Sequence, residues 1–116
     1  SASELEPLFR ATLPNHKLTF NGWSRKWRGG TATIRPDQGE RVLGGIYEVS
    51  ERDLRALDAH EGVPDTASRV KKMVVKDGGD WIEVATYIKR NQADESKPSP
   101  EYIAVVRQGY KDWRIV

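Results

Sequence analysis

The carboxylate of Glu61 stands out because it comes at the expected end of a helix. In LRALDAHEGVP, residues 54–64, leucines three residues apart predict a helix, and Gly62 and Pro64 are typical terminators. A helix C-terminus carries partial negative charge, so an anion there typically loses ~0.3–1 kcal/mol. A carboxylate at this position keeps its proton more readily, and burial of the side chain would act in the same direction. Such a group is suited to hold and release a proton. Glu61 is therefore a candidate general acid or base, and the alternative is a surface glutamate at a fraying helix end.

A second candidate is the basic aromatic stretch GWSRKWRGG, residues 22–30. It interleaves Arg25, Lys26 and Arg28 with Trp23 and Trp27, as a surface for single-stranded nucleic acid would. The alternative is an amphipathic loop and strand whose tryptophans pack inward. The second interpretation is favoured, because no RNA-binding motif accompanies the stretch and the net charge is low.

Composition excludes several kinds of site. The chain has no Cys, which excludes disulfides and thiolate chemistry, and its two histidines, His16 and His60, lie far apart without an acidic partner motif. We therefore expect no metal and no Ser-His-Asp triad. A net charge of +2, from 19 basic and 17 acidic residues, calls for neither a nucleic-acid nor a membrane partner. Without an apolar run of ~20 residues or a signal peptide, a cytoplasmic protein is expected.

Runs rich in Thr, Val, Ile, Tyr and Phe predict strands. They are KLTF at 17–20, TATI at 31–34 and VLGGIYEV at 42–49, bounded by Gly and Pro. RVKKMVV (69–75) and WIEVATYIKR (81–90), joined by DGGD, predict a β-hairpin. Glycine inside a strand, as at Gly44 and Gly45, usually marks a bulge, a bend or a closely approaching group.

Three helices are expected between these strands. SASELEPLFRATL, residues 1–13, has apolar residues at helical spacing, and Ser50–His60 opens with a capping-box-like Ser50 and closes at Gly62. Pro100 opens a third helix that ends near Gly109. At 116 residues, the chain has the length of one domain. The predicted fold class is α+β, a small mixed, mostly antiparallel β-barrel with short flanking helices.

Four strings share an order and spacing with a known family. WRGGTATI at 27–34, VLGGIYEV at 42–49, LRALDAHEGV at 54–63 and KPSPEY at 97–102 resemble the γ-glutamylcyclotransferase family. The family pattern is roughly Trp-x-Gly-Gly-x-Ala-x-Ile, Val-x-Gly, Leu-Asp-x-x-Glu-Gly and Pro-Ser-Pro-x-Tyr. Each string alone is weak, whereas four in register over nearly the entire chain are specific.

The resemblance implies an enzyme with a small-molecule γ-glutamyl substrate, a peptide or an amine. The substrate α-amine attacks its own γ-carbonyl, which gives 5-oxoproline and a free amine, without metal or other cofactor. The family's general base and acid falls on Glu61, and its substrate-contacting tyrosine falls on Tyr102, for which a core aromatic is the alternative. Asp58, three residues before Glu61 on the same helical face, is expected to have a structural role, and the alternative is that it repels the Glu61 carboxylate. Gly29, Gly30 and Gly44 are assigned to close backbone fit.

The chain departs from the family pattern at two places. The family's first strand ends in a Tyr-Gly-Ser-type loop whose N–H groups receive the glutamyl part, and this chain begins after it. Ser68 also stands where the family often has a tyrosine. The expectation is a single domain over residues 1–116 that lacks this strand and loop. The alternative function is a catalytically impaired remnant of the same fold that binds a ligand or a protein.

Overall fold

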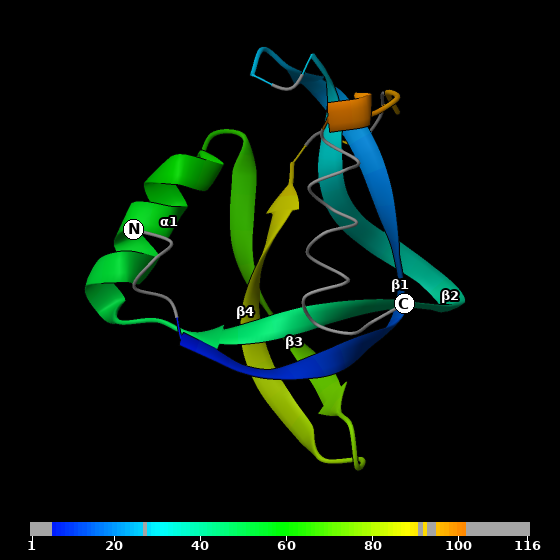
Figure 1. Ribbon diagram of the computed structural model, residues 1–116, viewed down its shortest axis with the longest axis vertical. Coiled ribbons are helices and arrows are strands. Elements are labelled where there is room, and N and C mark those ends of the chain that lie inside the picture. The colour runs from blue at the N-terminus through cyan, green and yellow to red at the C-terminus, as the bar shows by residue number, and fades with distance from the viewer. Residues whose placement is uncertain (1–5, 27, 91, 93–94, 102–116) are drawn as a thin grey trace.

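The described residues form a four-stranded sheet with one flanking helix. The computed structural model describes residues 6–101 except 27, 91, 93 and 94. In chain order, the elements are β1 (Glu6–Ser24), β2 (Gly29–Glu48), α1 (Glu51–Glu61), β3 (Ala67–Lys76) and β4 (Trp81–Lys89). The strand order in the sheet is β2-β1-β3-β4, and every neighbouring pair is antiparallel (Figure 1).

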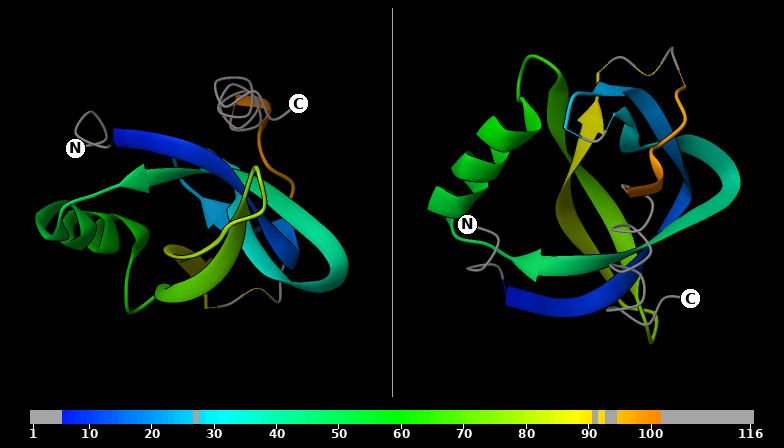
Figure 2. Two further views of the ribbon diagram at one scale, coloured as in Figure 1. Left: turned by 90° about the horizontal axis from the view of Figure 1, so that it is seen from below. Right: turned by 45° about the horizontal axis from the view of Figure 1, so that its top comes forward.

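The β1–β2 pair is long and bends halfway along its length. Its register shifts between Pro14 and His16, where Asn15 has a φ of 58° and accepts a hydrogen bond from the Gly39 backbone N–H at 3.1 Å. Irregularities of this kind bend a strand and increase its twist. The two halves of the pair therefore run in different directions, and Figure 2 shows the sheet curled into a half-barrel. The predicted fold class, a mostly antiparallel α+β barrel-like sheet, is confirmed.

The predicted helix over residues 1–13 is wrong, because the described part of this segment, from Glu6 onward, belongs to β1. Phe9, Ala11 and Leu13 alternate with Arg10 and Thr12, which is a strand period as well as part of a helical one. Ala11 and Leu13 are buried in the core. Pairing with β2 satisfies the backbone of this segment, and such tertiary pairing outweighs a local helical tendency.

The core joins strands that are distant in the sequence. Its buried members are Ala11, Leu13, Ile34 and Val74, one or more from each of β1, β2 and β3. Partly buried side chains pack against them, and these are Phe9, Leu18, Val42, Ile46, Ile82, Val84 and Ile88. The segments KLTF, TATI and VLGGIYEV are therefore strands as predicted, but each is a portion of β1 or β2 and not a separate short strand.

Helix α1 begins and ends within one residue of its predicted bounds. The Ser50 hydroxyl accepts a hydrogen bond from the Asp53 backbone N–H at 3.1 Å. Gly62 closes the helix with a φ of 82°, and its N–H and that of Val63 donate to the carbonyls of Ala59 and Asp58. Left-handed backbone of this kind favours glycine. The helix is thus fixed by local signals at both ends.

The same helix packs loosely against the sheet. None of its side chains is buried, and Leu54 and Leu57 line a largely apolar cleft of about 680 Å³ together with Phe9, Tyr47 and Val84. In Figure 1, α1 lies to one side of the sheet, next to the start of β3. Because α1 buries little apolar area, its position depends more on polar contacts.

The predicted hairpin of residues 69–90 is confirmed. β3 and β4 pair without interruption from Ala67 opposite Lys89 to Val75 opposite Trp81. Gly78 and Gly79 in the connection both have φ near 100°, as a tight turn of this sequence requires. The predicted third helix opens at Pro100, since Pro100 and Glu101 are helical, and its continuation to Gly109 lies outside the described residues.

Candidate active site

A cleft of about 500 Å³ opens where the C-terminal end of α1 meets the sheet. Residues of α1, β2, β3 and β4, of the α1–β3 connection and of the β1–β2 turn contribute to its walls. They are Lys26, Thr31, Ala32, Thr33, His60, Glu61, Thr66, Ala67, Tyr87 and Lys89. Both charge signs and several hydroxyl groups face this cleft, which suits a polar, charged small molecule.

Glu61 occupies the last position of α1 and lies in the wall of this cleft. Its side chain is exposed, so the burial that the sequence analysis considered for this residue does not occur. Within the part of the chain that the structure describes, its carboxylate forms no hydrogen bond or ion pair within 4.0 Å. Only its backbone carbonyl is engaged, by the Thr66 hydroxyl at 3.4 Å. The carboxylate is therefore open to a ligand.

Lys89 of β4 lines the cleft, and its side chain reaches two other strands. From β4, its Nζ donates to the backbone carbonyl of Asn21 on β1 at 2.7 Å and to that of Thr31 on β2 at 3.1 Å. It also donates to the Thr31 hydroxyl. Burial lowers the pKa of Lys89, and the negative charge of Glu61 opposes this by raising it. Glu61 and Lys89 are thus near enough to influence each other electrostatically.

A polar layer lies behind Lys89. Asn21 is fully buried and donates from its side chain to the Gln92 carbonyl at 3.0 Å, while it accepts from the Thr19 hydroxyl at 2.7 Å. The Gln92 amide in turn donates to the Ile34 carbonyl at 3.0 Å. The side-chain oxygen of Gln92 is buried without a hydrogen-bond partner among the described residues, but the hydrogen bonds that the layer does form fix the relative positions of its members. This layer holds the inner wall of the cleft in place.

Asp58 connects α1 to the sheet. Its carboxylate accepts a hydrogen bond from the Tyr87 hydroxyl at 2.6 Å and forms an ion pair with Arg69 at 3.4 Å. Burial raises the pKa of Tyr87 to about 12, and the hydrogen bond to Asp58 and its charge act in the same direction. The structural role expected for Asp58 fits this geometry, since the contact holds the last turn of α1, which carries Glu61, against β3 and β4.

Replacing Asp58 by Ala should loosen this end of α1. Hydrogen bonds to charged groups are worth ~1.5–3 kcal/mol, and partial exposure of the pair reduces this. We expect the free energy of unfolding to fall by about 1–2 kcal/mol in chemical denaturation, and the amide hydrogens of α1 to exchange faster. Asp65→Ala is the matched control, because Asp65 is exposed nearby. Equal effects of the two substitutions would contradict this role for Asp58.

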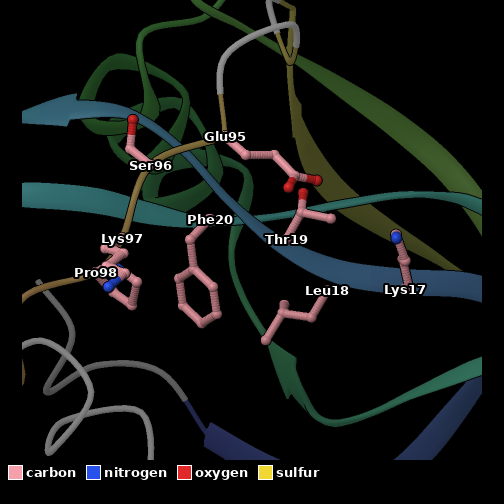
Figure 3. A pocket seen from close by; sticks show the side chains of 8 residues that line it. All are labelled: Lys17, Leu18, Thr19, Phe20, Glu95, Ser96, Lys97 and Pro98. Carbon is pink, nitrogen blue, oxygen red and sulfur yellow. The ribbon is translucent and has the colours of Figure 1, made fainter.

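The glycine pair Gly29–Gly30 lies directly under the segment 95–99. The Gly30 N–H donates to the Lys97 carbonyl at 2.9 Å, and the Ser96 N–H donates to the Phe20 carbonyl at 2.9 Å. A Cβ on Gly29 would be 2.7 Å from both the Lys97 oxygen and the Ser99 nitrogen. Figure 3 shows the residues 95–98 running beside the strand that carries residues 17–20. Two of the four recognised strings, WRGGTATI and KPSPEY, therefore meet in space.

Gly44 does not share this role. A Cβ there would find no atom within 4 Å, so the expectation of close backbone fit is wrong at this position. The pairing register passes through Gly44 and Gly45 regularly, and the nearest irregularity lies between Ile46 and Tyr47. The glycines of VLGGIYEV therefore do not mark a bulge at their own positions. Gly44 does not mark a close contact either.

Of the residues predicted from the sequence, Glu61 lies in the cleft and Tyr102 lies outside the described residues. Arg25, Lys26 and Arg28 are exposed, whereas Trp27 and the side chain of Trp23 are not described. Sequence reasoning missed Tyr87 and Lys89. A signal for them existed, because residues two apart on a strand share one face, so ATYIKR places a tyrosine and a lysine on the same side of β4.

Within the described ranges, no helix is long and apolar enough to cross a membrane.

The comparisons with known proteins agree on one family. A profile described as "Gamma-glutamyl cyclotransferase, AIG2-like" matches residues 2–114. The proteins named gamma-glutamylcyclotransferase of Mus musculus and Homo sapiens are each 31% identical over 107 residues, which is 88% of this chain and 56% of theirs. A Bos taurus protein named gamma-glutamylaminecyclotransferase is 30% identical over 67% of this chain and 61% of its own.

Solved structures extend the similarity to three dimensions. One titled "Gamma-glutamyl cyclotransferase" superposes with a TM-score of 0.93 and 26% identity, covering 97% of this chain and 69% of the other. The crystal structure of a Homo sapiens protein gives a TM-score of 0.90 at 28% identity, covering 95% and 68%. The chain spans just over half the length of the mouse and human relatives. With a family profile matched over nearly its whole length, this chain belongs to the γ-glutamyl cyclotransferase, AIG2-like family.

Proposed function

We propose that this protein is a γ-glutamylcyclotransferase that converts a γ-glutamyl peptide or γ-glutamyl amine into 5-oxoproline and a free amine. The observation that carries the proposal is the carboxylate of Glu61, which lies in a cleft lined by charged and hydroxyl groups and is engaged by no described side chain. It stands at the glutamate of the string LDAHEG within the family match. The names of the relatives support the same class of reaction.

The reaction is an intramolecular aminolysis and needs one well-placed base. An amine with a pKa of ~8 is mostly ammonium at neutral pH and cannot attack a carbonyl in that form. Glu61 takes a proton from the α-ammonium, and the free amine then attacks the γ-carbonyl carbon. The bond between that carbon and the leaving nitrogen breaks as Glu61 returns the proton to the nitrogen. The attacking nitrogen loses a second proton as it becomes the lactam N–H, and the same carboxylate passes this proton to the released amine, which leaves as an ammonium. The carboxylate ends the cycle in its starting state.

The position of Glu61 suits this exchange. It is the last residue of α1, and its backbone is fixed by the Gly62 closure and by the Thr66 hydroxyl. The adjacent turn is further held through Asp58 and Tyr87. A carboxylate on a fixed backbone, with its oxygens free, can meet the α-amine without first breaking another contact.

The test is the release of 5-oxoproline by the purified protein. It is incubated with γ-glutamyl amino acids and with γ-glutamyl amines, and 5-oxoproline is quantified by mass spectrometry against a reaction without protein. Release from at least one substrate class supports the proposal. If none releases 5-oxoproline above the uncatalysed rate, while the protein is folded by circular dichroism, the proposed function is wrong.

Tyr102 is the second residue assigned to this function. Its hydroxyl is proposed to contact the substrate, so Tyr102→Phe should raise KM and lower kcat/KM about tenfold, the effect of one lost hydrogen bond to a charged group. Tyr47→Phe is the control, because Tyr47 is exposed at the separate apolar cleft. An unchanged kcat/KM for Tyr102→Phe would exclude this contact.

A further inference from the structure

Tyr87 lines the same cleft as Glu61, and its hydroxyl proton is already in use. The hydroxyl donates to the Asp58 carboxylate at 2.6 Å. Because an ionised carboxylate accepts hydrogen bonds and cannot donate one, the direction of this bond is fixed. Among the described residues, no group donates a hydrogen bond to the phenolic oxygen in return. That oxygen can therefore accept a hydrogen bond from a ligand, but it has no proton left to donate to one.

The charges that act on this oxygen favour a cation. Burial is the largest cause that raises the pKa of Tyr87 to about 12, and the hydrogen bond to Asp58 and the negative charges of Asp58 and Glu61 act in the same direction. The Arg69 guanidinium opposes them from its ion pair with Asp58. The phenol is thus neutral at neutral pH and lies within the influence of two carboxylates. A positively charged donor is attracted to such a place, and an anion is repelled.

A γ-glutamyl substrate has one positively charged donor on its glutamyl part, the α-ammonium. The α-carboxylate beside it has no N–H group and carries the opposite charge. An ammonium has three N–H groups, and the proposed reaction engages one of them with Glu61. A second acceptor close to Glu61 can therefore bind the same nitrogen.

We propose that Tyr87 is a further substrate-binding residue, whose phenolic oxygen accepts a hydrogen bond from the α-ammonium as this group meets Glu61. The inference rests on the proposed function. An ammonium and the amine that it becomes both have N–H groups, so the contact persists when Glu61 takes the proton. Tyr87 thereby holds the attacking nitrogen in place through the proton transfer, which is the kind of positioning that favours an intramolecular attack.

The test compares two ligands that differ only at the α-carbon. γ-Glutamylalanine has the ammonium there, and glutarylalanine has a hydrogen atom in its place. Dissociation constants are measured by calorimetry on the Glu61→Gln protein, which binds without rapid turnover. We expect γ-glutamylalanine to bind about tenfold more tightly than glutarylalanine, the scale of one hydrogen bond to a charged group. The additional substitution Tyr87→Phe should bring this ratio close to one.

Asp58→Ala is the matched control. It breaks the same hydrogen bond between Asp58 and Tyr87, but it leaves the phenolic oxygen in the cleft. If Tyr87 only held α1 in place, both substitutions would weaken the binding of both ligands by the same factor. If Tyr87 binds the ammonium, Tyr87→Phe removes the ratio, whereas Asp58→Ala retains most of it.

Two results would overturn the inference. One is equal binding of the two ligands to the Glu61→Gln protein, and the other is a ratio that Tyr87→Phe leaves unchanged or that Asp58→Ala lowers just as far. Should Tyr87→Phe fail to fold, the protein with both Glu61→Gln and Asp58→Ala decides. It lacks both carboxylates that act on Tyr87, so a ratio well above one supports the phenolic oxygen as the acceptor, and a ratio of one contradicts it.

The inference and the proposed function can fail separately, because binding to the Glu61→Gln protein requires no turnover. If no substrate yields 5-oxoproline but Tyr87→Phe removes the preference for the ammonium, the proposed reaction is wrong and the ammonium contact stands. If 5-oxoproline forms and the preference does not depend on Tyr87, the reaction stands and the contact is wrong.

Discussion

Glu61→Gln is expected to lower the rate of 5-oxoproline formation by about 10²–10⁴, the usual contribution of a positioned acid or base. Glutamine has nearly the same shape but cannot accept the proton of the α-ammonium. The substitution should leave the fold intact, because the side chain is exposed and its carboxylate engages no other described residue. The measurement is kcat at neutral pH, together with the free energy of unfolding of both proteins.

The pH dependence gives this prediction a second readout. An amine with a pKa of ~8 loses its proton without help as the pH rises above that value. The defect of Glu61→Gln should therefore shrink between about pH 7 and pH 9, whereas a merely structural defect would persist. Glu83→Gln, an exposed substitution on β4, is the control and should match the unsubstituted protein. Activity of Glu61→Gln equal to that of Glu83→Gln would exclude Glu61 as the base.

Gly30→Ala is expected to destabilise the protein by about 1–3 kcal/mol, the typical effect of forcing an extra methyl group into a packed site. A Cβ at this position would overlap with the backbone of Ser96, which cannot rotate away as the end of a flexible side chain can. The hydrogen bond from the Gly30 N–H to the Lys97 carbonyl would be strained as well. Chemical denaturation measures the loss.

The matched control lies on the same strand. Gly44→Ala also changes a glycine of β2, but its new methyl group would meet no atom within 4 Å. It should be neutral or stabilise by up to about 1 kcal/mol, because alanine restricts the unfolded chain more than glycine. The segment 95–99 leads to Tyr102, so Gly30→Ala should also reduce kcat/KM. Equal stabilities of the two variants would show that the close approach at Gly30 is unimportant.

The parts of the fold that were predicted correctly depend on neighbours in the sequence. Helix α1 is specified by the Ser50 cap and the Gly62 closure, and the β3–β4 hairpin by alternating apolar residues around DGGD. Each signal acts over a few residues, so it can be read without knowledge of the rest of the chain. The same holds for Glu61, whose place at a helix end follows from those caps.

The N-terminal segment shows where local reasoning fails. Residues 1–13 have helical spacing, but the described part pairs with residues 42–48 of β2, 29 to 42 positions away. Nothing within the segment reveals that partner. The resemblance to a family supplied the roles that we propose for Glu61 and Tyr102, but it did not reveal which groups surround the carboxylate.

The sequence by itself determined the caps of α1, the hairpin and the glutamate at the helix end, because these depend on short-range backbone geometry and hydrogen bonding. Only the tertiary structure decided that β1 is a strand, that Asp58 reaches Tyr87 over 29 positions, and that Lys89 crosses to Asn21 over 68 positions. These contacts depend on how the sheet curls, which brings distant segments together at the cleft. The contacts that hold the Lys89 side chain in the cleft therefore become visible only once the strands are assembled.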